Sequence, residues 1–326
     1  MDLAAAARSI NQTAYGYISS WALLTASELQ LFDLLPATAS DLADEFPDAD
    51  LVDTWMHVLA GEGIVEQDDH GRWSQSPEMA RMLVGDQSYS GYLGGQVLQQ
   101  MTPRLTLGVT GDNVLGNVLR EPHVRTGYEG WFSDAEEARS YQESQFAGSL
   151  GPAKAIAAAL PEVAGRVLDI GGGWGAIARA VAKKHDVDVD VVDFGTVIDV
   201  APDAGPNVHF IEGNALDATS WPTHPDGETY DGAILSYLFS SIPGDEHERL
   251  LESVANTDIR WIAIHDFMVG SGTHAAAWSL QHAVFVPGHS SRTADEISAM
   301  LGDVGFVMSD ARPLIDEMTT LVVATR

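Results

Sequence analysis

The chain has 326 residues, and its 47 acidic against 17 basic side chains give a formal net charge of −30. This acidic excess argues against binding to nucleic acids and to anionic membranes, because few cations are present to neutralise phosphates. The absence of cysteine excludes disulfides, iron–sulfur clusters and thiolate zinc sites. No apolar run reaches the length of a membrane span, and the first residues do not resemble a signal peptide, so a cytoplasmic protein is expected.

The first part of the chain carries the pattern of three helices and a hairpin. Apolar spacing predicts helices over 12–35, 40–46 and 51–60, followed by a hairpin over 64–74. Ser40 and Asp50 are the expected N-caps of the second and third helices. This order indicates a winged-helix unit, which we place within residues 1–105.

Winged helices often bind DNA, but the charge of this one disfavours that function. Residues 1–80 contain two basic side chains, Arg8 and Arg72, against fourteen acidic ones, whereas a DNA-binding helix needs a basic face. The apolar residues of the first helices, together with those of 88–107, exceed what one small domain needs. They are better explained by a dimer interface.

The most informative stretch runs from Arg166 to Ala182. It reads as a short buried strand, a glycine loop and an alanine-rich helix, which is the opening of a βαβ unit. Gly171, Gly173 and Gly175 let the chain turn sharply and let a ligand approach the backbone. The spacing also satisfies the dinucleotide fingerprint, so the loop alone does not identify the nucleotide.

Two acidic residues favour a different cofactor. Asp169 lies in the strand just before the glycines, and Asp193 closes the next strand, where a carboxylate can bind both ribose hydroxyls. With this D-x-G-x-G-x-G pattern the chain resembles the S-adenosylmethionine (SAM) methyltransferases. The resemblance implies SAM as the cofactor.

The rest of the chain alternates strands and helices, as a doubly wound α/β sheet requires. Strands are predicted at 167–170, 189–193, 208–211, 230–236, 261–265, 305–309 and 319–324. The last two are close enough to form an antiparallel hairpin at the sheet edge. We therefore expect a Rossmann-like α/β domain over 106–326, with a helical linker and cap at 106–160. Because ligands bind at the carboxyl ends of such strands, Asn214 and Ser236 join the expected cofactor site.

Over nearly its whole length the chain resembles small-molecule methyltransferases of the plant O-methyltransferase type. The resemblance implies a homodimer formed by the winged helix, and a small metabolite as substrate. Residues 142–156 are similar to bacterial members that act on 2-oxo acids. That similarity implies that Trp131, Tyr141, Gln145 and Phe146 lie near the substrate, although aromatic residues at this spacing also suit a plain core.

The chain departs from this family at the catalytic base. The family has His-Asp-Trp after the fourth strand of the sheet, and its histidine takes the proton of the substrate hydroxyl. Matching Asp231 and 245–247 to the family pattern places Ser240-Ser241-Ile242 there. Serine is not basic enough to replace the histidine.

Other residues must then remove the proton. The candidates are His265, Asp266, His282, His289 and Glu317, of which His265, Asp266 and His282 are the favoured catalytic groups. His282 is weighed against simple packing among apolar neighbours. His289 is expected to face solvent. Three further histidines are expected to be structural, namely His185, His209 and His247.

A divalent metal is a second way to replace the base. In the 2-oxo acid C-methyltransferases that use a metal, a similar His-Asp pair helps to hold the ion that stabilises the enolate. The resemblance implies an iron, zinc or manganese site at His265, Asp266 and Glu317. The alternative is that His265 forms hydrogen bonds within the core.

Since the usual base is missing, C-methylation of a 2-oxo acid is favoured. O-methylation of an aromatic or hydroxy metabolite with a non-standard base is the first alternative. A SAM-binding enzyme that catalyses a decarboxylation, rearrangement or cyclisation is the second. A silent binding protein is disfavoured because the glycine loop and Asp193 are intact.

Overall fold

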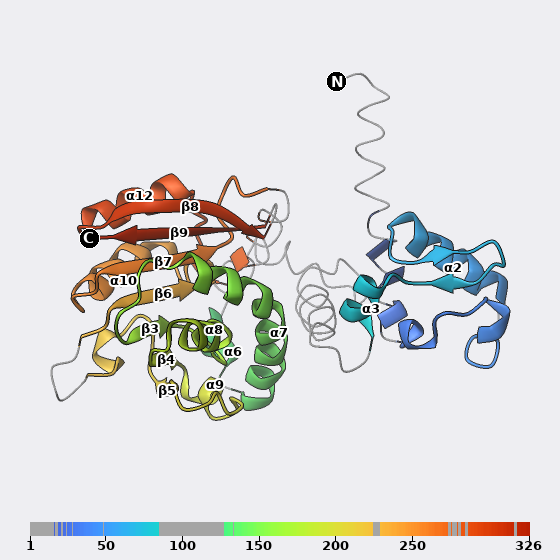
Figure 1. Cartoon of the computed structure of the whole chain (residues 1–326), viewed down its shortest axis with the longest axis horizontal. Helices are drawn as coiled ribbons and strands as arrows, with labels where there is room; N and C mark the ends of the chain where they lie inside the picture. Colours follow the sequence, from blue (N-terminus) through green and yellow to red (C-terminus); the bar gives the residue numbers. More distant parts are fainter. Residues whose placement is uncertain are drawn as a thin grey trace, which may run out of the picture. The chain divides into compact units, whose positions relative to one another are not determined.

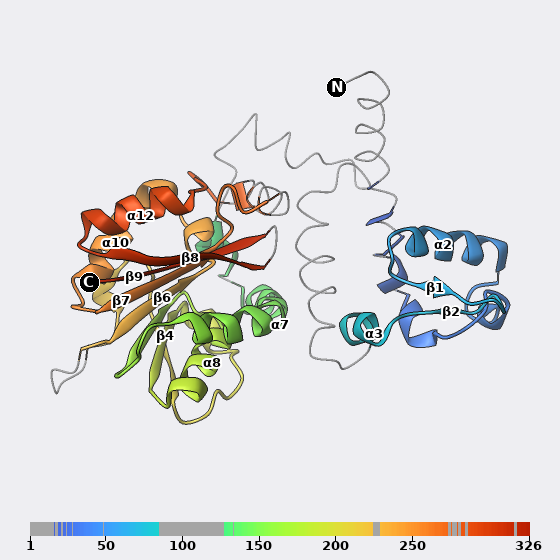
Figure 2. The same ribbon diagram turned by 45° about the horizontal axis from the view of Figure 1, so that its top comes forward.

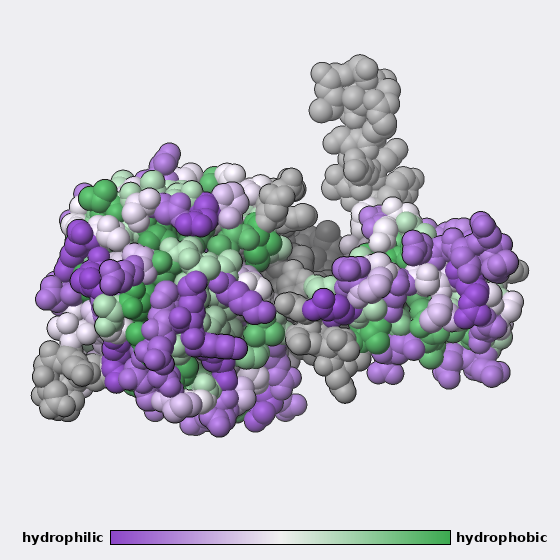
Figure 3. Space-filling view, viewed as in Figure 1, coloured by the Kyte–Doolittle hydropathy of each residue, from purple (hydrophilic) through white to green (hydrophobic). Residues whose placement is uncertain are grey.

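The computed structural model describes residues 29–47, 49–84, 127–132, 134–223, 229–272, 286–315 and 318–326, with single positions within 16–27 and 275–283. The chain forms two compact units, Met1–Gln99 and Gln100–Arg326. The boundary that the sequence suggests at residue 105 lies outside the described residues. Hydrophilic side chains are spread over the visible face of each unit, interspersed with apolar ones (Figure 3).

The N-terminal unit packs short helices against a two-stranded hairpin (Figure 1). Its elements are η1 (Leu31–Leu34), η2 (Ser40–Leu42), α2 (Ala49–Gly61), β1 (Glu66–Gln67), β2 (Trp73–Ser74) and α3 (Pro77–Leu83). The strands pair antiparallel, which confirms the predicted hairpin. Phe32, Met56, Leu59 and Trp73 are each at most 1% exposed and form the core of the unit.

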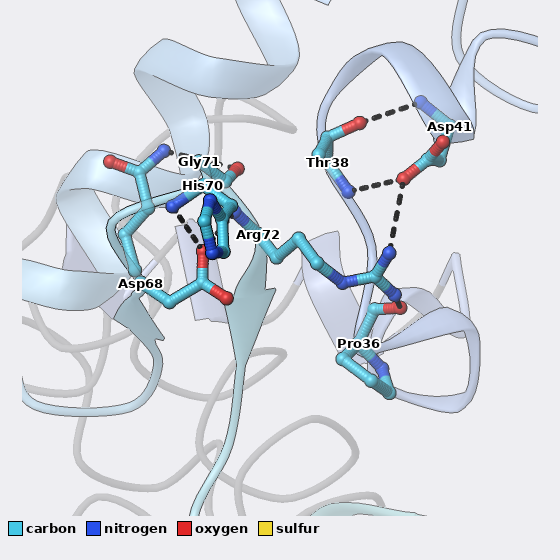
Figure 4. Close-up of polar contacts among 8 residues, drawn as sticks. Pro36, Thr38, Asp41, Asp68, His70, Gly71 and Arg72 are labelled. Atoms are coloured by element: carbon cyan, nitrogen blue, oxygen red, sulfur yellow. Dashed lines mark hydrogen bonds and ion pairs between the residues drawn. The ribbon is translucent and has the colours of Figure 1, made fainter.

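Side chains on both sides of the hairpin turn hold the turn and a neighbouring loop (Figure 4). The Asp68 carboxylate accepts hydrogen bonds from the backbone N–H groups of His70 at 2.8 Å and Arg72 at 2.9 Å. The Arg72 guanidinium donates to the carbonyl of Pro36 at 2.7 Å. Arg72 therefore fastens the hairpin to the preceding loop.

Both predicted N-caps of this unit are wrong. Ser40 lies inside η2, because Thr38 and Asp41 already exchange two hydrogen bonds, from Thr38 N to Asp41 Oδ2 and from Asp41 N to Thr38 Oγ1. These bonds satisfy the turn two residues earlier than predicted. Asp50 lies inside α2, which begins at Ala49.

The C-terminal unit is a seven-stranded sheet in the order β5-β4-β3-β6-β7-β9-β8. The strands are β3 (Val167–Ile170), β4 (Val189–Asp193), β5 (Val208–Glu212), β6 (Gly232–Ser236), β7 (Trp261–Asp266), β8 (Val307–Ile315) and β9 (Thr319–Thr325). All pairs are parallel except those made by β9, which is antiparallel to β7 and β8. The predicted Rossmann-like fold with an antiparallel end is confirmed.

Helices cover both faces of this sheet (Figure 2). One face packs against α10 (His247–Ala255) and α12 (Ala294–Asp303), and the other against α7 (Ala135–Ala159) and α8 (Ala176–His185). Alternate residues of each strand serve the two faces, as Leu168 and Val167 of β3 show. This double burial explains why the strands read as continuous apolar runs. No helix in the described part of the chain is long and apolar enough to span a membrane.

Candidate active site

A cavity of about 320 Å³ lies at the carboxyl ends of the parallel strands, where ligands bind in open α/β sheets. Its wall is formed by the glycine loop after β3, the end of β4, the segments after β5 and β6, and two helices that precede the sheet. These helices are α6 (Gly127–Trp131) and α7. The N-terminus of α7 is fixed by Asp134, whose carboxylate accepts from the backbone N–H of Glu136 at 2.9 Å.

The glycine loop has the backbone shape that its composition requires. Gly171, Gly173 and Gly175 have φ values of 69°, 56° and 71°, which side chains rarely adopt. At Gly172 the requirement is steric, because the surrounding side chains leave no room for a Cβ atom. A Cβ atom there would lie 2.7 Å from Cγ of Asp169 and 2.9 Å from Cγ1 of Val191.

Asp193 lines the cavity and holds the loop in place. Its Oδ2 accepts from Gly173 N at 2.8 Å, and its Oδ1 accepts from Phe194 N at 2.8 Å. Desolvation raises the pKa of this carboxyl to about 6, although the two backbone N–H groups act in the opposite direction. The carboxylate still has lone pairs that can accept hydroxyl protons from a ligand.

Asp169 lies beneath the loop and does not line the cavity. It is 0% exposed, and neither of its carboxyl oxygens has a hydrogen-bond partner among the residues that the structure describes. Burial, and then the charge of Asp193, raise its pKa to about 7. Asp169 therefore supports the glycine loop and does not contact a ligand in the cavity.

The other predicted cofactor residues also divide into those that line the cavity and those that do not. Gly171, Gly173, Asn214 and Ser236 line the cavity with Asp193, whereas Gly175 does not. The Asn214 side chain accepts through Oδ1 from the backbone N–H of Leu216 at 2.9 Å, so its oxygen shapes the loop after β5. Its amide nitrogen is the group that can donate to a ligand.

The predicted substrate residues lie on α6 and α7. Tyr141, Gln145 and Phe146 line the cavity. Trp131 is the last residue of α6, and its side chain lies outside the described part of the structure. The cavity wall also includes Tyr128 and Phe132, whose rings lie 5.5 and 5.1 Å from that of Tyr141.

His265 lies in the core of the sheet. It is 0% exposed and does not belong to the cavity wall. Ser236 Oγ lies 2.9 Å from its Nδ1, and Thr319 Oγ1 lies 2.9 Å from its Nε2, so hydroxyl groups engage both ring nitrogens. Burial lowers the pKa of this imidazole to about 3, which leaves it uncharged at neutral pH.

Asp266 points to the other face of the sheet, as expected for the next residue of a strand. Its Oδ2 accepts from Ser240 N at 3.0 Å and its Oδ1 accepts from Phe267 N at 2.7 Å. Burial raises its pKa to about 6. The carboxylate thus fixes the segment after β6 and, like His265, stays outside the cavity wall.

The predicted metal ligands do not combine into a site in the described residues. His265 uses both nitrogens for hydroxyl groups, and Asp266 faces the opposite side of the sheet. Glu317 lies outside the described residues. No group of three His, Cys, Asp or Glu side chains with metal-binding geometry occurs in the described parts of the chain. The residues that are described therefore do not fit the implied ion.

His282 lies beside Tyr128 of the cavity wall. It is 4% exposed, and its Nδ1 lies 3.2 Å from the hydroxyl of Tyr128, which accepts from the hydroxyl of Tyr141 at 3.0 Å. The rings of His282 and His289 stack with centroids 6.3 Å apart. The two cavity tyrosines thus lead to a buried histidine.

His289 is half-buried and both of its ring nitrogens have partners, so it is not the solvent-facing side chain that was predicted. Its Nδ1 lies 3.1 Å from the carbonyl of Ser240, and its Nε2 lies 3.1 Å from Ser279 Oγ. The glycine beside it suggested an exposed loop, but the loop is folded against the segment after β6. His247 is buried with Nε2 2.9 Å from the carbonyl of Phe239, and burial lowers its pKa to about 4.

Several residues of the cavity wall were missed from the sequence. Tyr237 follows β6 directly and has φ of 56°, an uncommon conformation for a residue other than glycine that often marks a functional site. Its strand-end position was the available signal. Trp174 lies within the glycine loop and donates from Nε1 to the carbonyl of Val197 at 3.2 Å. The other missed wall residues include Tyr128, Phe132, Gln142, Phe194, Leu238 and Ile242.

Two family models match this chain. Residues 123–307 match the O-methyltransferase domain, and residues 11–86 match the O-methyltransferase dimerisation domain. The chain is 27% identical, over 94% of its length and 92% of the relative's, to the N,N-dimethyltransferase OxyT of Streptomyces rimosus.

Two solved structures share the fold along the whole chain. CalO1, a methyltransferase in calicheamicin biosynthesis in its S-adenosylhomocysteine (SAH)-bound form, has a TM-score of 0.73 at 20% identity, covering 100% of this chain and 99% of that one. Human N-acetylserotonin methyltransferase in complex with SAM has a TM-score of 0.77 at 16% identity, covering 100% and 98%. At these identities the likeness supports the fold.

The sheet order, the glycine loop and the cavity beside Asp193 define the Rossmann-like methyltransferase class, whose cofactor is SAM. The chain belongs to the O-methyltransferase family, since the catalytic-domain model alone matches more than half of it. It is a SAM-dependent methyltransferase that acts on small molecules.

Proposed function

We propose that this protein methylates an oxygen or nitrogen atom of an aromatic small metabolite. One observation carries the proposal: a single cavity joins the glycine loop and Asp193 to a wall of aromatic side chains. Such a cavity can hold the cofactor and a flat acceptor side by side. A methyl transfer of this kind depends mainly on positioning and on exclusion of water.

The cofactor end of the cavity suits SAM. When bound, SAM supplies a methyl group on a positively charged sulfur, open to displacement by a nucleophile. We assign binding of the ribose hydroxyls to the Asp193 carboxylate. We assign hydrogen-bond donation to the adenine ring of SAM to Asn214. The glycines of the loop leave room for the backbone to approach the ligand.

The charge of the cavity favours an uncharged or cationic acceptor. Among the described wall residues, Asp193 and Glu129 are the acidic side chains, and neither lysine nor arginine occurs. A carboxylate substrate would find no counter-ion in this wall, and its desolvation would be costly. The relative OxyT, named an N,N-dimethyltransferase, is consistent with an amine as one acceptor.

C-methylation of a 2-oxo acid, which the missing base favours from the sequence, draws less support from these residues. The described wall lacks a cation for the acid, and His265 and Asp266 are engaged within the fold. The same assay distinguishes methyl transfer from a reaction in which the enzyme binds SAM without consuming it. We also propose a homodimer, supported by the match of residues 11–86 to a dimerisation domain.

The test is an assay of purified protein with SAM and a panel of phenols, aromatic amines and 2-oxo acids, with and without a chelator. We expect SAH release and a mass gain of one methyl group with a phenol or an aromatic amine, unaffected by the chelator. Chelator-sensitive methylation of a 2-oxo acid would replace this proposal with metal-dependent C-methylation. Conversion of an acceptor without loss of SAM would indicate the non-methylating class.

A further inference from the structure

The tyrosine pair beside His282 forms a directed hydrogen-bond chain that starts at the cavity wall. Tyr141 and Tyr128 both line the cavity, while His282 does not. The Tyr141 hydroxyl donates to the Tyr128 hydroxyl at 3.0 Å. The Tyr128 proton is then available for His282 Nδ1, 3.2 Å away. With His282 Nδ1 as the acceptor, each donor in the chain points away from the cavity and toward the imidazole.

We propose that Tyr141, Tyr128 and His282 form a relay that removes the acceptor's proton during methyl transfer. This inference rests on the proposed function. His282 is the final base, and the two tyrosine hydroxyls conduct the proton from the cavity. Tyr141 and Tyr128 touch the acceptor, whereas His282 acts through them.

The proton and electron balance of the step is complete without another reagent. The acceptor's oxygen or nitrogen forms a bond to the methyl carbon as the carbon–sulfur bond breaks, and that electron pair stays on sulfur. The acceptor's proton passes to the Tyr141 oxygen, the Tyr141 proton to Tyr128, and the Tyr128 proton to Nδ1 of His282. Both tyrosines end unchanged, and the imidazolium later releases its proton to water.

The surroundings of His282 suit a group that accepts a proton and returns it. Its ring is 4% exposed, so water does not compete directly for Nδ1. The ring of Phe267 lies 5.6 Å away and that of His289 6.3 Å away. Tyr128 and His289 are titratable groups that face it.

The relay needs His282 in one tautomer. Because Nδ1 accepts from Tyr128, the ring proton must sit on Nε2 in the neutral state. In protein carrying ¹⁵N-histidine and saturated with SAH, NMR should show the neutral Nε2–H form, with the resonance assigned by its loss in His282→Gln. Tyr128→Phe should shift the Nδ1 resonance, since it removes the donor and keeps the ring. An Nδ1–H tautomer in the wild type would overturn the relay.

Rates with the best acceptor of the panel give the second test. Tyr128→Phe and His282→Gln should each lower kcat by roughly 10²-fold, a typical contribution of general acid–base catalysis. The double variant should be no slower than the slower single variant, because groups that act as a unit are not additive. In each variant the fall of kcat with falling pH, caused by protonation of the base, should disappear.

The control is His209→Gln, which removes an exposed histidine of β5 that pairs with Asp188. It should leave kcat, SAH affinity and the pH profile as in the wild type. Unchanged kcat in Tyr128→Phe, or multiplied losses in the double variant, would overturn the relay while leaving methyl transfer intact. The NMR measurement needs only SAH, so failure of the whole acceptor panel would count against the proposed function and not against the hydrogen-bond chain.

Discussion

Asp169 of β3 and Asp193 of β4 are two carboxyl groups beside the glycine loop with different tasks. Asp193 faces the cavity and binds the loop through Gly173 N. Asp169 lies under the same loop without a hydrogen-bond partner in the described residues. The first should therefore control ligand affinity, and the second should control the stability of the loop.

Replacing Asp193 by alanine should weaken SAH binding by about 1.5–3 kcal/mol, the usual range for hydrogen bonds to a charged group. This corresponds to a loss of roughly ten- to a hundredfold in affinity, measured by titration calorimetry. Asp199→Ala is the matched control, since Asp199 is exposed and lies outside the cavity wall. Equal affinities of the wild type and Asp193→Ala would remove Asp193 from the cofactor site.

Asp169 should make the unfolding free energy depend on pH. Its carboxyl holds more protons in the folded than in the unfolded chain between pH 3.8 and about 7. Its contribution to stability therefore falls as the pH rises through this window, by at most about 1.4 kcal/mol per unit. The buried histidines change the unfolding free energy in the opposite direction as the pH rises. Because they are present in both the wild type and Asp169→Asn, the difference between the two proteins isolates the effect of Asp169. Urea unfolding should show that the unfolding free energy of Asp169→Asn, relative to the wild type, is higher at pH 7.5 than at pH 5. The same difference between the two proteins at both pH values would contradict this.

The sequence predicted the glycine loop and Asp193 because a local pattern carries them. It could not predict the surroundings of His265, because its partners come from distant strands. Ser236 lies opposite His265 in the β6–β7 register, and Thr319 begins β9. These pairings decide which atoms meet an imidazole, and no local spacing encodes them. His282 escaped a clear assignment for the same reason, since Tyr128 is 154 residues away along the chain.

At the scale of elements, the turn between β3 and α8 is limited by space as well as by backbone conformation. Gly172→Ala should cost about 1–3 kcal/mol of unfolding free energy, typical of overpacking, because its Cβ would press on Asp169 and Val191. Gly302→Ala is the matched control, since nothing lies within 4 Å of a Cβ there and Gly302 is in α12. It should be neutral or stabilising. Similar unfolding midpoints for the two variants would contradict the steric argument.

Strands were easier to predict than the helices of the first unit. β3 and β4 match their predicted bounds fully, because a strand buried on both faces is a short apolar run ended by loop residues. Helix starts depend on which of several neighbouring polar side chains wins the first hydrogen bond. Thr38 and Asp41 took that role from Ser40, and the sequence does not rank such competitors.

At the scale of the whole molecule, the net charge of −30 should oppose the proposed association of two copies. Each subunit repels the other at low ionic strength, and salt screens this repulsion. Sedimentation should give about 70 kDa, twice the 34.9 kDa of the chain, with a dimer dissociation constant that decreases from low to moderate salt. A monomer at every protein and salt concentration would contradict the dimer.

Trp174 gives the molecule an optical property. Its indole sits between two glycines of the loop and forms part of the cavity wall, whereas Trp73 and Trp261 are buried in the cores of the two units. A ligand that settles against the loop changes the polarity around that one indole and leaves the core tryptophans in constant surroundings. Its fluorescence emission should therefore change when a ligand occupies the cofactor end, in unlabelled protein and against the constant emission of the core tryptophans.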